Sequence, residues 1–208
     1  MADLKFLVAE PLTRSIVWRG ARDSIYLTFD DGPHPEATPT VLRVLRAHKI
    51  HATFFLVGAH IERHRALAQS LVQEGHALGN HGYAHRPLWF SRASTIADEL
   101  HRTQRLIDAL TSSTTRWVRP PYSRFDPFLL AAIRRLGYRC VMYSVDSKDY
   151  RLQDSHLIAA RATKNLAGGD IILMHDNDFT ARTIERTLSN VVEIALAKGL
   201  KFSTLSGV

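Results

Sequence analysis

Short apolar runs alternate with amphipathic stretches along the chain, and this alternation restricts the fold more than any other feature. The runs are rich in β-branched and aromatic residues, which is typical of strands buried on both faces. We expect strands at residues 25–29, 52–57, 77–80, 117–119, 139–145 and 171–174, and a weaker one at 201–204. Apolar residues recur with helical spacing near residues 41–45, 61–72, 96–110, 128–136, 155–166 and 183–198.

This alternation predicts an α/β fold with a mostly parallel sheet and helices outside it. Roughly seven strand–helix units could either close into a small barrel or remain an open, doubly wound sheet. The length of 208 residues suits one core, so we expect residues 1–208 to form a single domain. Polar residues follow directly on several strands. Because parallel strands end on one face of such folds, that face is where we expect the site.

Composition excludes a membrane-spanning helix, since no stretch approaches the ~20 apolar residues that a bilayer requires. Residues 1–10 lack the segments of a signal peptide. We therefore expect the protein to be cytoplasmic if the chain is complete as given. If a leader has been removed, we expect it to be periplasmic or extracellular. The single cysteine, Cys140, excludes an intramolecular disulfide, and its apolar surroundings indicate a buried small hydrophobe.

The net charge of +7 favours anionic partners. Basic residues are scattered among acidic ones and form no run longer than two, which indicates a solvated basic surface. An anionic cell-wall polymer as substrate would also suit this charge. We expect no nucleic-acid partner, no membrane span and a monomer.

The first motif that carries chemistry is TFDDGP, from Thr28 to Pro33. The adjacent carboxylates of Asp30 and Asp31 repel each other, which raises the pKa of one of them. A bound cation would relieve this repulsion, so that one carboxylate binds the ion while the other serves as a base. The alternative is an ordinary turn with solvated acids.

The second motif is the pair His81 and His85, because two imidazoles four residues apart can bind one ion. Together with a carboxylate they suit Zn²⁺ or a similar first-row divalent ion. The chain has 11 histidines, so an isolated pair of this spacing would more often be structural or exposed. The glutamate of the HExxH metalloprotease helix is absent, which argues against that class.

The third motif is Arg119 followed by two prolines and Tyr122. The prolines fix the backbone and leave the amide N–H of Tyr122 as the first available donor. A rigid N–H near a metal could stabilise an oxyanion, although a structural turn is an alternative. Two further motifs end at Tyr150 and His175. His175 could be a core histidine, but beside a metal it would act as a general acid, oriented by Asp149.

In this order the motifs resemble those of the polysaccharide deacetylase family, carbohydrate esterase family 4, also called the NodB-homology domain. The resemblance covers roughly residues 24–205. It implies a distorted (β/α)7 barrel of mostly parallel strands with outer helices. It also implies a metal-dependent hydrolase that removes N-acetyl groups from an amino-sugar polymer or oligomer of the chitooligosaccharide or peptidoglycan type. The implied ion is most simply Zn²⁺, with Co²⁺ or Ni²⁺ as alternatives.

The same resemblance implies roles for individual residues. It implies a base, an arginine that orients the base, a general acid and a carboxylate that tunes the acid, at Asp30, Arg119, His175 and Asp149. It implies metal ligands at Asp31, His81 and His85. It implies an acetyl pocket and an oxyanion donor at Leu173, Tyr150 and Tyr122.

Four positions depart from the family's motifs. Gly82 replaces a serine or threonine, which removes a hydroxyl that would brace the second motif's loop. Tyr150 replaces a tryptophan, so the wall of the acetyl pocket is smaller and gains a hydroxyl. Ser123 stands where glycine is common, and Arg86 where proline is common. None of these changes deletes a catalytic group, so they bear on substrate choice.

A sugar-binding groove requires an aromatic platform. We favour Trp89 with Phe90, since they closely follow the second motif, over Trp18 and Tyr122; simple packing or a hydrophobic lid is the alternative. A carbohydrate substrate is expected. Other functions remain open: the same metal chemistry on O-acetyl esters such as acetyl xylan or on a small amide or imide, a non-catalytic carbohydrate-binding protein, and a basic nucleic-acid binder.

Overall fold

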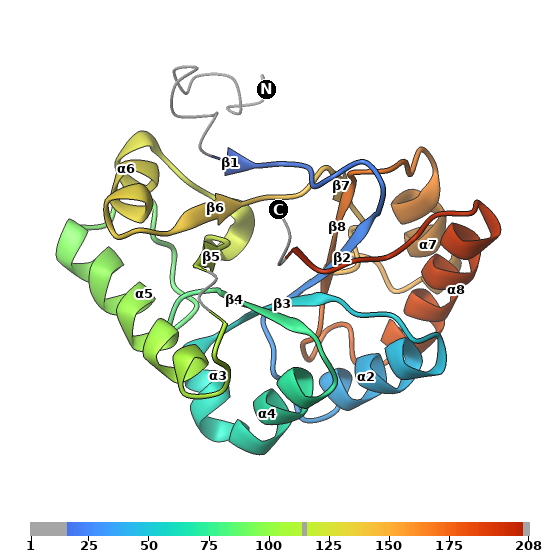
Figure 1. Cartoon of the computed structure of the whole chain (residues 1–208), viewed down its shortest axis with the longest axis horizontal. Coiled ribbons are helices and arrows are strands. Elements are labelled where there is room, and N and C mark those ends of the chain that lie inside the picture. Colours follow the sequence, from blue (N-terminus) through green and yellow to red (C-terminus); the bar gives the residue numbers. More distant parts are fainter. Residues whose placement is uncertain (1–15, 114–115, 206–208) are drawn as a thin grey trace.

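The computed structural model describes residues 16–113 and 116–205 (Figure 1). Within this part, eight strands form one sheet in the order β1-β6-β5-β4-β3-β2-β8-β7, and every neighbouring pair is parallel. The strands are β1 (Ile16–Val17), β2 (Tyr26–Asp30), β3 (Thr53–Leu56), β4 (Ala77–Asn80), β5 (Trp117–Val118), β6 (Arg139–Val141), β7 (Val145–Asp146) and β8 (Ile171–His175).

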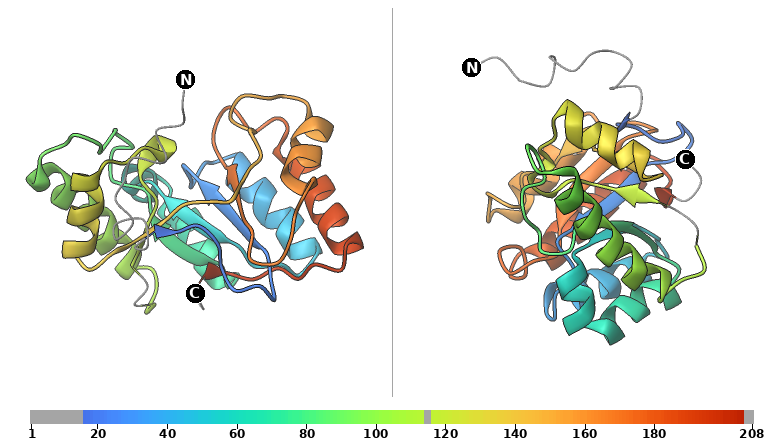
Figure 2. Two further views of the ribbon diagram at one scale, coloured as in Figure 1. Left: turned by 90° about the horizontal axis from the view of Figure 1, so that it is seen from above. Right: turned by 90° about the vertical axis from the view of Figure 1, so that its left-hand side faces the viewer.

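Helices cover the outer side of the curled sheet (Figure 1 and Figure 2). In the described ranges they are α2 (Ala37–Ala47), α3 (Gly58–Arg63), α4 (Arg65–Gln73), α5 (Ala93–Asp108), α6 (Pro127–Arg135), α7 (Ser155–Thr163) and α8 (Ile184–Ala197). In α2, for example, Val41, Leu42 and Leu45 are buried on one face, as helical spacing predicts. No helix of the described ranges is long and apolar enough to cross a membrane.

The sheet curls into a half-barrel, and the predicted barrel-like α/β fold is confirmed. The run 139–145, expected as one strand, is instead two strands that lie at different ends of the sheet order, β6 and β7. Met142 donates its N–H to Val17 in β1 at 2.8 Å, whereas Ser144 donates to Ile171 in β8 at 3.1 Å. The segment between β6 and β7 therefore bridges the gap between the two sides of the half-barrel.

Two further boundaries differ from the prediction. The strand β1 was not expected, because its two residues are too short a run to stand out. Residues 201–204, expected as a weak strand, contribute only an isolated parallel bridge between Phe202 and Ile25. The division of the chain into domains stays a prediction, and residues 1–10 lie outside the described ranges.

The largest part of the core lies between the sheet and the helices α2 and α8. Phe29 and Phe54 stack there with ring centroids 5.0 Å apart, and both are fully buried. Cys140 is also buried, and burial raises the pKa of its thiol to about 12. A thiol of this kind is not nucleophilic at neutral pH, so the prediction that Cys140 is a buried hydrophobe is confirmed.

Strand register places the motifs side by side. Asp30 at the end of β2 is paired with His175 at the end of β8, and Asn80 at the end of β4 is paired with Val118 in β5. The residues after these strands therefore lie on one face of the sheet, as expected for parallel strands.

Candidate active site

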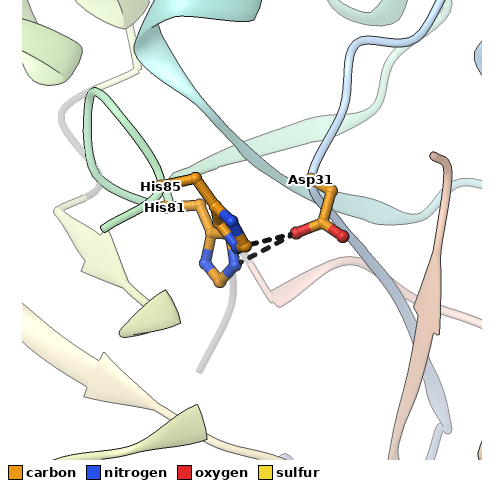
Figure 3. A group of neighbouring side chains, drawn as sticks. All are labelled: Asp31, His81 and His85. Atoms are coloured by element: carbon orange, nitrogen blue, oxygen red, sulfur yellow. Dashed lines mark ion pairs between the residues drawn. The ribbon is translucent and has the colours of Figure 1, made fainter. Parts of the chain in front are cut away.

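Three side chains from two loops meet at this face (Figure 3). Asp31 follows β2, while His81 and His85 come from the loop after β4. Asp31 Oδ1 lies 3.0 Å from His85 Nε2 and 3.5 Å from His81 Nε2. The ligand atoms all lie within 4.8 Å of one another, so the group could hold one metal ion.

Neighbouring groups fix the orientation of these ligands. His81 donates from Nδ1 to the carbonyl oxygen of Arg119 at 2.7 Å, which leaves the lone pair of Nε2 for an ion. Asp31 Oδ2 accepts a hydrogen bond from Asn177 at 2.7 Å, which leaves Oδ1 facing the imidazoles. Burial alone would raise the pKa of Asp31, but its contacts with the His81 and His85 rings hold that pKa well below its usual range. An ionised carboxylate with two imidazoles fits a Zn²⁺-like ion with positions left open.

The loop that carries the imidazoles is held by a glutamate on α5. Glu99 is 3% exposed, and its Oε2 accepts hydrogen bonds from the backbone N–H groups of Tyr83 and Ala84, both at 2.8 Å. Its other oxygen pairs with Arg86 Nε at 2.8 Å. The sequence indicated that Gly82 removes a hydroxyl that would brace this loop, and Glu99 supplies a brace from another element.

Asp30 is bound to a buried arginine. Arg119 is fully buried and donates to Asp30 Oδ1 at 2.7 Å and to Thr28 Oγ1 at 2.8 Å. Two of its other N–H groups donate to the carbonyl oxygens of Val141 at 3.2 Å and Met142 at 3.0 Å. With its donors committed in this way, the guanidinium holds Asp30 in one orientation.

A second charged pair lies beside Asp30, at the end of the neighbouring strand β8. His175 Nδ1 lies 2.8 Å from Asp149 Oδ1, and the backbone N–H of His175 donates to Asp149 Oδ2 at 2.7 Å. Burial alone would lower the pKa of His175, but the hydrogen bond and charge of Asp149, with the charges of Asp31 and Asp30, raise it to about 9. The imidazolium is therefore the form present at neutral pH, with Nε2–H as its free donor.

Gly32 and Asp176 explain why the first motif needs a glycine. A Cβ on Gly32 would lie 2.3 Å from Asp176 Oδ2, so no side chain fits there. Asp176 donates its N–H to the carbonyl oxygen of Asp30 at 3.1 Å and accepts a hydrogen bond from Thr38. Burial raises the pKa of Asp176 well above its usual range, and its side chain packs directly against Gly32 of the motif.

These groups open into a pocket of about 490 Å³. It is lined by Asp30, Asp31, His81, His85, Pro87, Tyr122, Ser123, Arg124, Tyr143, Tyr150, Leu173 and His175. All the predicted metal, base and acid residues are thus on one cavity, together with the three residues predicted for the acetyl pocket and the oxyanion. Tyr143 and Arg124 also line it and were missed by sequence reasoning.

Tyr122 sits in the 3₁₀ turn Pro121–Ser123 with a φ of 61°, in the left-handed region. Its ring lies 4.7 Å from the ring of His85, and its hydroxyl donates to the carbonyl oxygen of His85 at 3.2 Å. No acceptor among the described residues takes the amide N–H of Tyr122. The predicted oxyanion donor is therefore available.

Trp89, the favoured residue of the predicted aromatic platform, does not line the pocket itself but contacts Arg124, which does. The Trp89 ring packs 5.2 Å from that of Phe90, under the guanidinium of Arg124 at 5.1 Å. Trp18 makes an edge contact with Phe125 at 6.4 Å. Sugar contact by Trp89 stays a prediction.

Residues 19–141 match the family model described as polysaccharide deacetylase. The chain belongs to the polysaccharide deacetylase family. It is 32% identical to a chitooligosaccharide deacetylase of Azorhizobium caulinodans over 156 residues, which cover 74% of each chain. These findings confirm the predicted family and the prediction of a deacetylase.

Solved structures agree with this assignment. The crystal structure of a peptidoglycan N-acetylglucosamine deacetylase matches this polysaccharide deacetylase with a TM-score of 0.88 at 28% identity, covering 93% of this chain and 92% of the other. A family 4 pseudoenzyme from Bacillus anthracis matches with a TM-score of 0.83 at 25% identity, covering 92% and 68%. Because the fold is shared with a pseudoenzyme, activity has to be argued from the site.

Proposed function

We propose that the chain is a metal-dependent hydrolase that removes N-acetyl groups from an amino-sugar polymer or oligomer. The observation that carries this proposal is the meeting, in one pocket, of three metal-binding side chains, an arginine-bound carboxylate and an aspartate-bound imidazolium. The relatives support it, since they include a chitooligosaccharide deacetylase and a peptidoglycan N-acetylglucosamine deacetylase.

The residues Asp31, His81 and His85 would hold the ion, for which Zn²⁺ is our proposal and Co²⁺ and Ni²⁺ are the alternatives. When bound, such an ion polarises an acetyl carbonyl and makes a nearby water more acidic. The hydrogen bond that His81 donates to the carbonyl oxygen of Arg119, and the one that Asp31 accepts from Asn177, hold these ligands in place.

Asp30 is the proposed base. Its Oδ1 is committed to Arg119, and its Oδ2 lies 3.8 Å from His81 Nε2, beside the metal ligands. Oδ2 is therefore free to take a proton from the attacking water. Arg119 holds Asp30 in this orientation, so it is a positioning residue.

The oxyanion of the tetrahedral intermediate would accept a hydrogen bond from the free N–H of Tyr122. His175 then donates the proton on Nε2 to the nitrogen of the leaving amine, while Asp149 holds its other ring nitrogen. An amide needs this proton more than an ester does, because an amine leaves poorly without one. An imidazolium present at neutral pH therefore meets the requirement of N-deacetylation.

Leu173 and Tyr150 would form the pocket for the acetyl methyl group. Leu173 is 2% exposed, whereas Tyr150 is 36% exposed and is tied to Asp146 by a hydrogen bond of 3.3 Å. The wall made by Tyr150 is therefore held in place by its own loop.

Acetate release tests the proposal. Chelator-treated protein reloaded with Zn²⁺, Co²⁺ or Ni²⁺ is assayed on chitotetraose, acetylated xylan and a small acetyl ester, with chelator-treated protein as the blank. We expect metal-dependent release from chitotetraose above the other two substrates. Release from acetylated xylan alone would favour an esterase, and no release with bound metal would favour a carbohydrate-binding protein.

A further inference from the structure

Arg124 lines the same pocket as the proposed metal ligands but takes no part in the proposed chemistry. It directly follows the turn Pro121–Ser123, which carries the proposed oxyanion donor Tyr122. Its side chain is exposed, so the guanidinium can reach a ligand that enters the pocket. A cation that lines this pocket can bind a group on a substrate that enters it.

The guanidinium is held in place by an aromatic ring. Its central carbon lies 5.1 Å from the ring centroid of Trp89, which packs against Phe90. Phe90 donates its N–H to Asp126 Oδ2 at 2.5 Å, which ties this aromatic pair to the start of α6. Stacking on tryptophan leaves the edge of an arginine, with its N–H donors, free for a planar anion.

Other cations near the pocket are neutralised within the fold, whereas Arg124 is not. Arg86 pairs with Glu99 at 2.8 Å, and Lys148 pairs with Asp146. Among the residues that the structure describes, Arg124 makes no ion pair. The nearest acid along the chain, Asp126, already accepts hydrogen bonds from two backbone N–H groups at the start of α6.

We propose that Arg124, seated on Trp89, binds a carboxylate on the sugar next to the one being deacetylated. The substrate class is then an acidic glycan with a free carboxylate on alternate sugars, as in peptidoglycan strands from which the stem peptides have been removed, and not neutral chitin. This inference rests on the proposed function. It also gives a role to the net charge of +7, since a basic protein attracts an anionic polymer. A carboxylate fits the fork of donors on a guanidinium better than a neutral hydroxyl does.

The test compares substrates that differ only in charge. Acetate release is measured on a peptide-free tetrasaccharide of alternating N-acetylglucosamine and N-acetylmuramic acid, on its methyl ester, and on chitotetraose. We expect Arg124→Gln to lower kcat/KM on the free acid about tenfold more than on the methyl ester or on chitotetraose. For Arg124→Lys we expect a kcat/KM on the free acid between those of the unaltered protein and Arg124→Gln, because an ammonium keeps the charge but loses the planar fork.

The control is Arg135→Gln, which makes the same charge change on an exposed residue of α6. This variant should leave the ratio of kcat/KM on the free acid to kcat/KM on the methyl ester unchanged. Raising the salt concentration from about 20 to about 200 mM should reduce the preference for the acid in the unaltered protein and have little effect in Arg124→Gln.

An equal loss on all three substrates, or no loss, in Arg124→Gln would overturn the carboxylate subsite while leaving the deacetylase in place. No acetate from any of the three substrates with the unaltered protein would instead count against the proposed function. Metal content and the thermal unfolding midpoint, measured on each variant, separate a binding effect from misfolding.

Discussion

The pair Asp149–His175 makes a prediction about pH. As general acid, His175 must carry its proton, so activity is present below its pKa and is lost as the pH rises through it. The structure raises that pKa from 6.5 to about 9, against the opposing effect of burial. We therefore expect kcat/KM on chitotetraose to fall only near pH 9.

Asp149→Asn removes the charge and replaces one acceptor oxygen by an amide nitrogen. The ring then keeps the burial that lowers its pKa and loses the hydrogen bond and charge of Asp149, the two largest effects that raise it. We expect the pKa of His175 to return to its ordinary value or below. For pKa values of about 9 and about 6.5, the protonated fraction at pH 8 falls from about 90% to about 3%, and at pH 6 it changes less than about twofold. The loss of kcat/KM should therefore be about twentyfold larger at pH 8 than at pH 6.

The assay is the pH profile of kcat/KM with metal-loaded protein, supported by NMR titration of the His175 ring. Asp146→Asn is the matched control, because Asp146 ends β7 three residues before Asp149 and pairs with Lys148 instead of His175. A profile in Asp149→Asn that keeps its fall near pH 9 would refute the assignment of His175 as the acid tuned by Asp149. If the fall in the pH profile moved to the same lower pH in Asp149→Asn and Asp146→Asn, only the net charge near His175 would matter.

Three further variants test other parts of the site. Asp30→Asn should lower kcat by about 10³-fold or more while zinc content stays at that of the unaltered protein; near-normal turnover would remove Asp30 as base. Glu99→Gln should weaken zinc affinity about 10- to 100-fold, because its charged oxygens hold the loop of the ligands, whereas Asp98→Asn, exposed on the same helix, should not; equal affinities would show that the brace is unimportant. Gly32→Ala should destabilise the protein by about 1–3 kcal/mol in denaturant unfolding, since the new Cβ would overlap Asp176; an unchanged midpoint would contradict this packing.

The sequence could predict which site residues lie at the C-terminal ends of strands. Asp30 and His175 each follow an apolar run, and parallel pairing of β2 with β8 sets them side by side. The same reasoning fails for the run 139–145, because hydrophobicity does not say which strand a backbone pairs with. Only the structure shows that this run leaves β1 and joins β8 partway along.

Groups that act through distant contacts could not be predicted. Glu99 contacts backbone N–H groups 15 and 16 residues away in sequence, and Asn177 contacts Asp31 across 146 residues. The single acidic residue among the apolar positions of α5 was a signal for Glu99, since a buried charge needs partners. Nothing comparable marked Asn177 or Arg124 in the sequence.

The central claim is that Asp31, His81 and His85 bind one divalent ion. Equilibrium dialysis of chelator-treated protein against Zn²⁺, with metal measured by mass spectrometry, tests it without any assumption about substrate. We predict one tightly bound ion per chain, lost in His81→Ala and retained in His76→Ala, which changes a buried histidine outside this site. Stoichiometric zinc in His81→Ala, or none in the unaltered protein, would contradict the account.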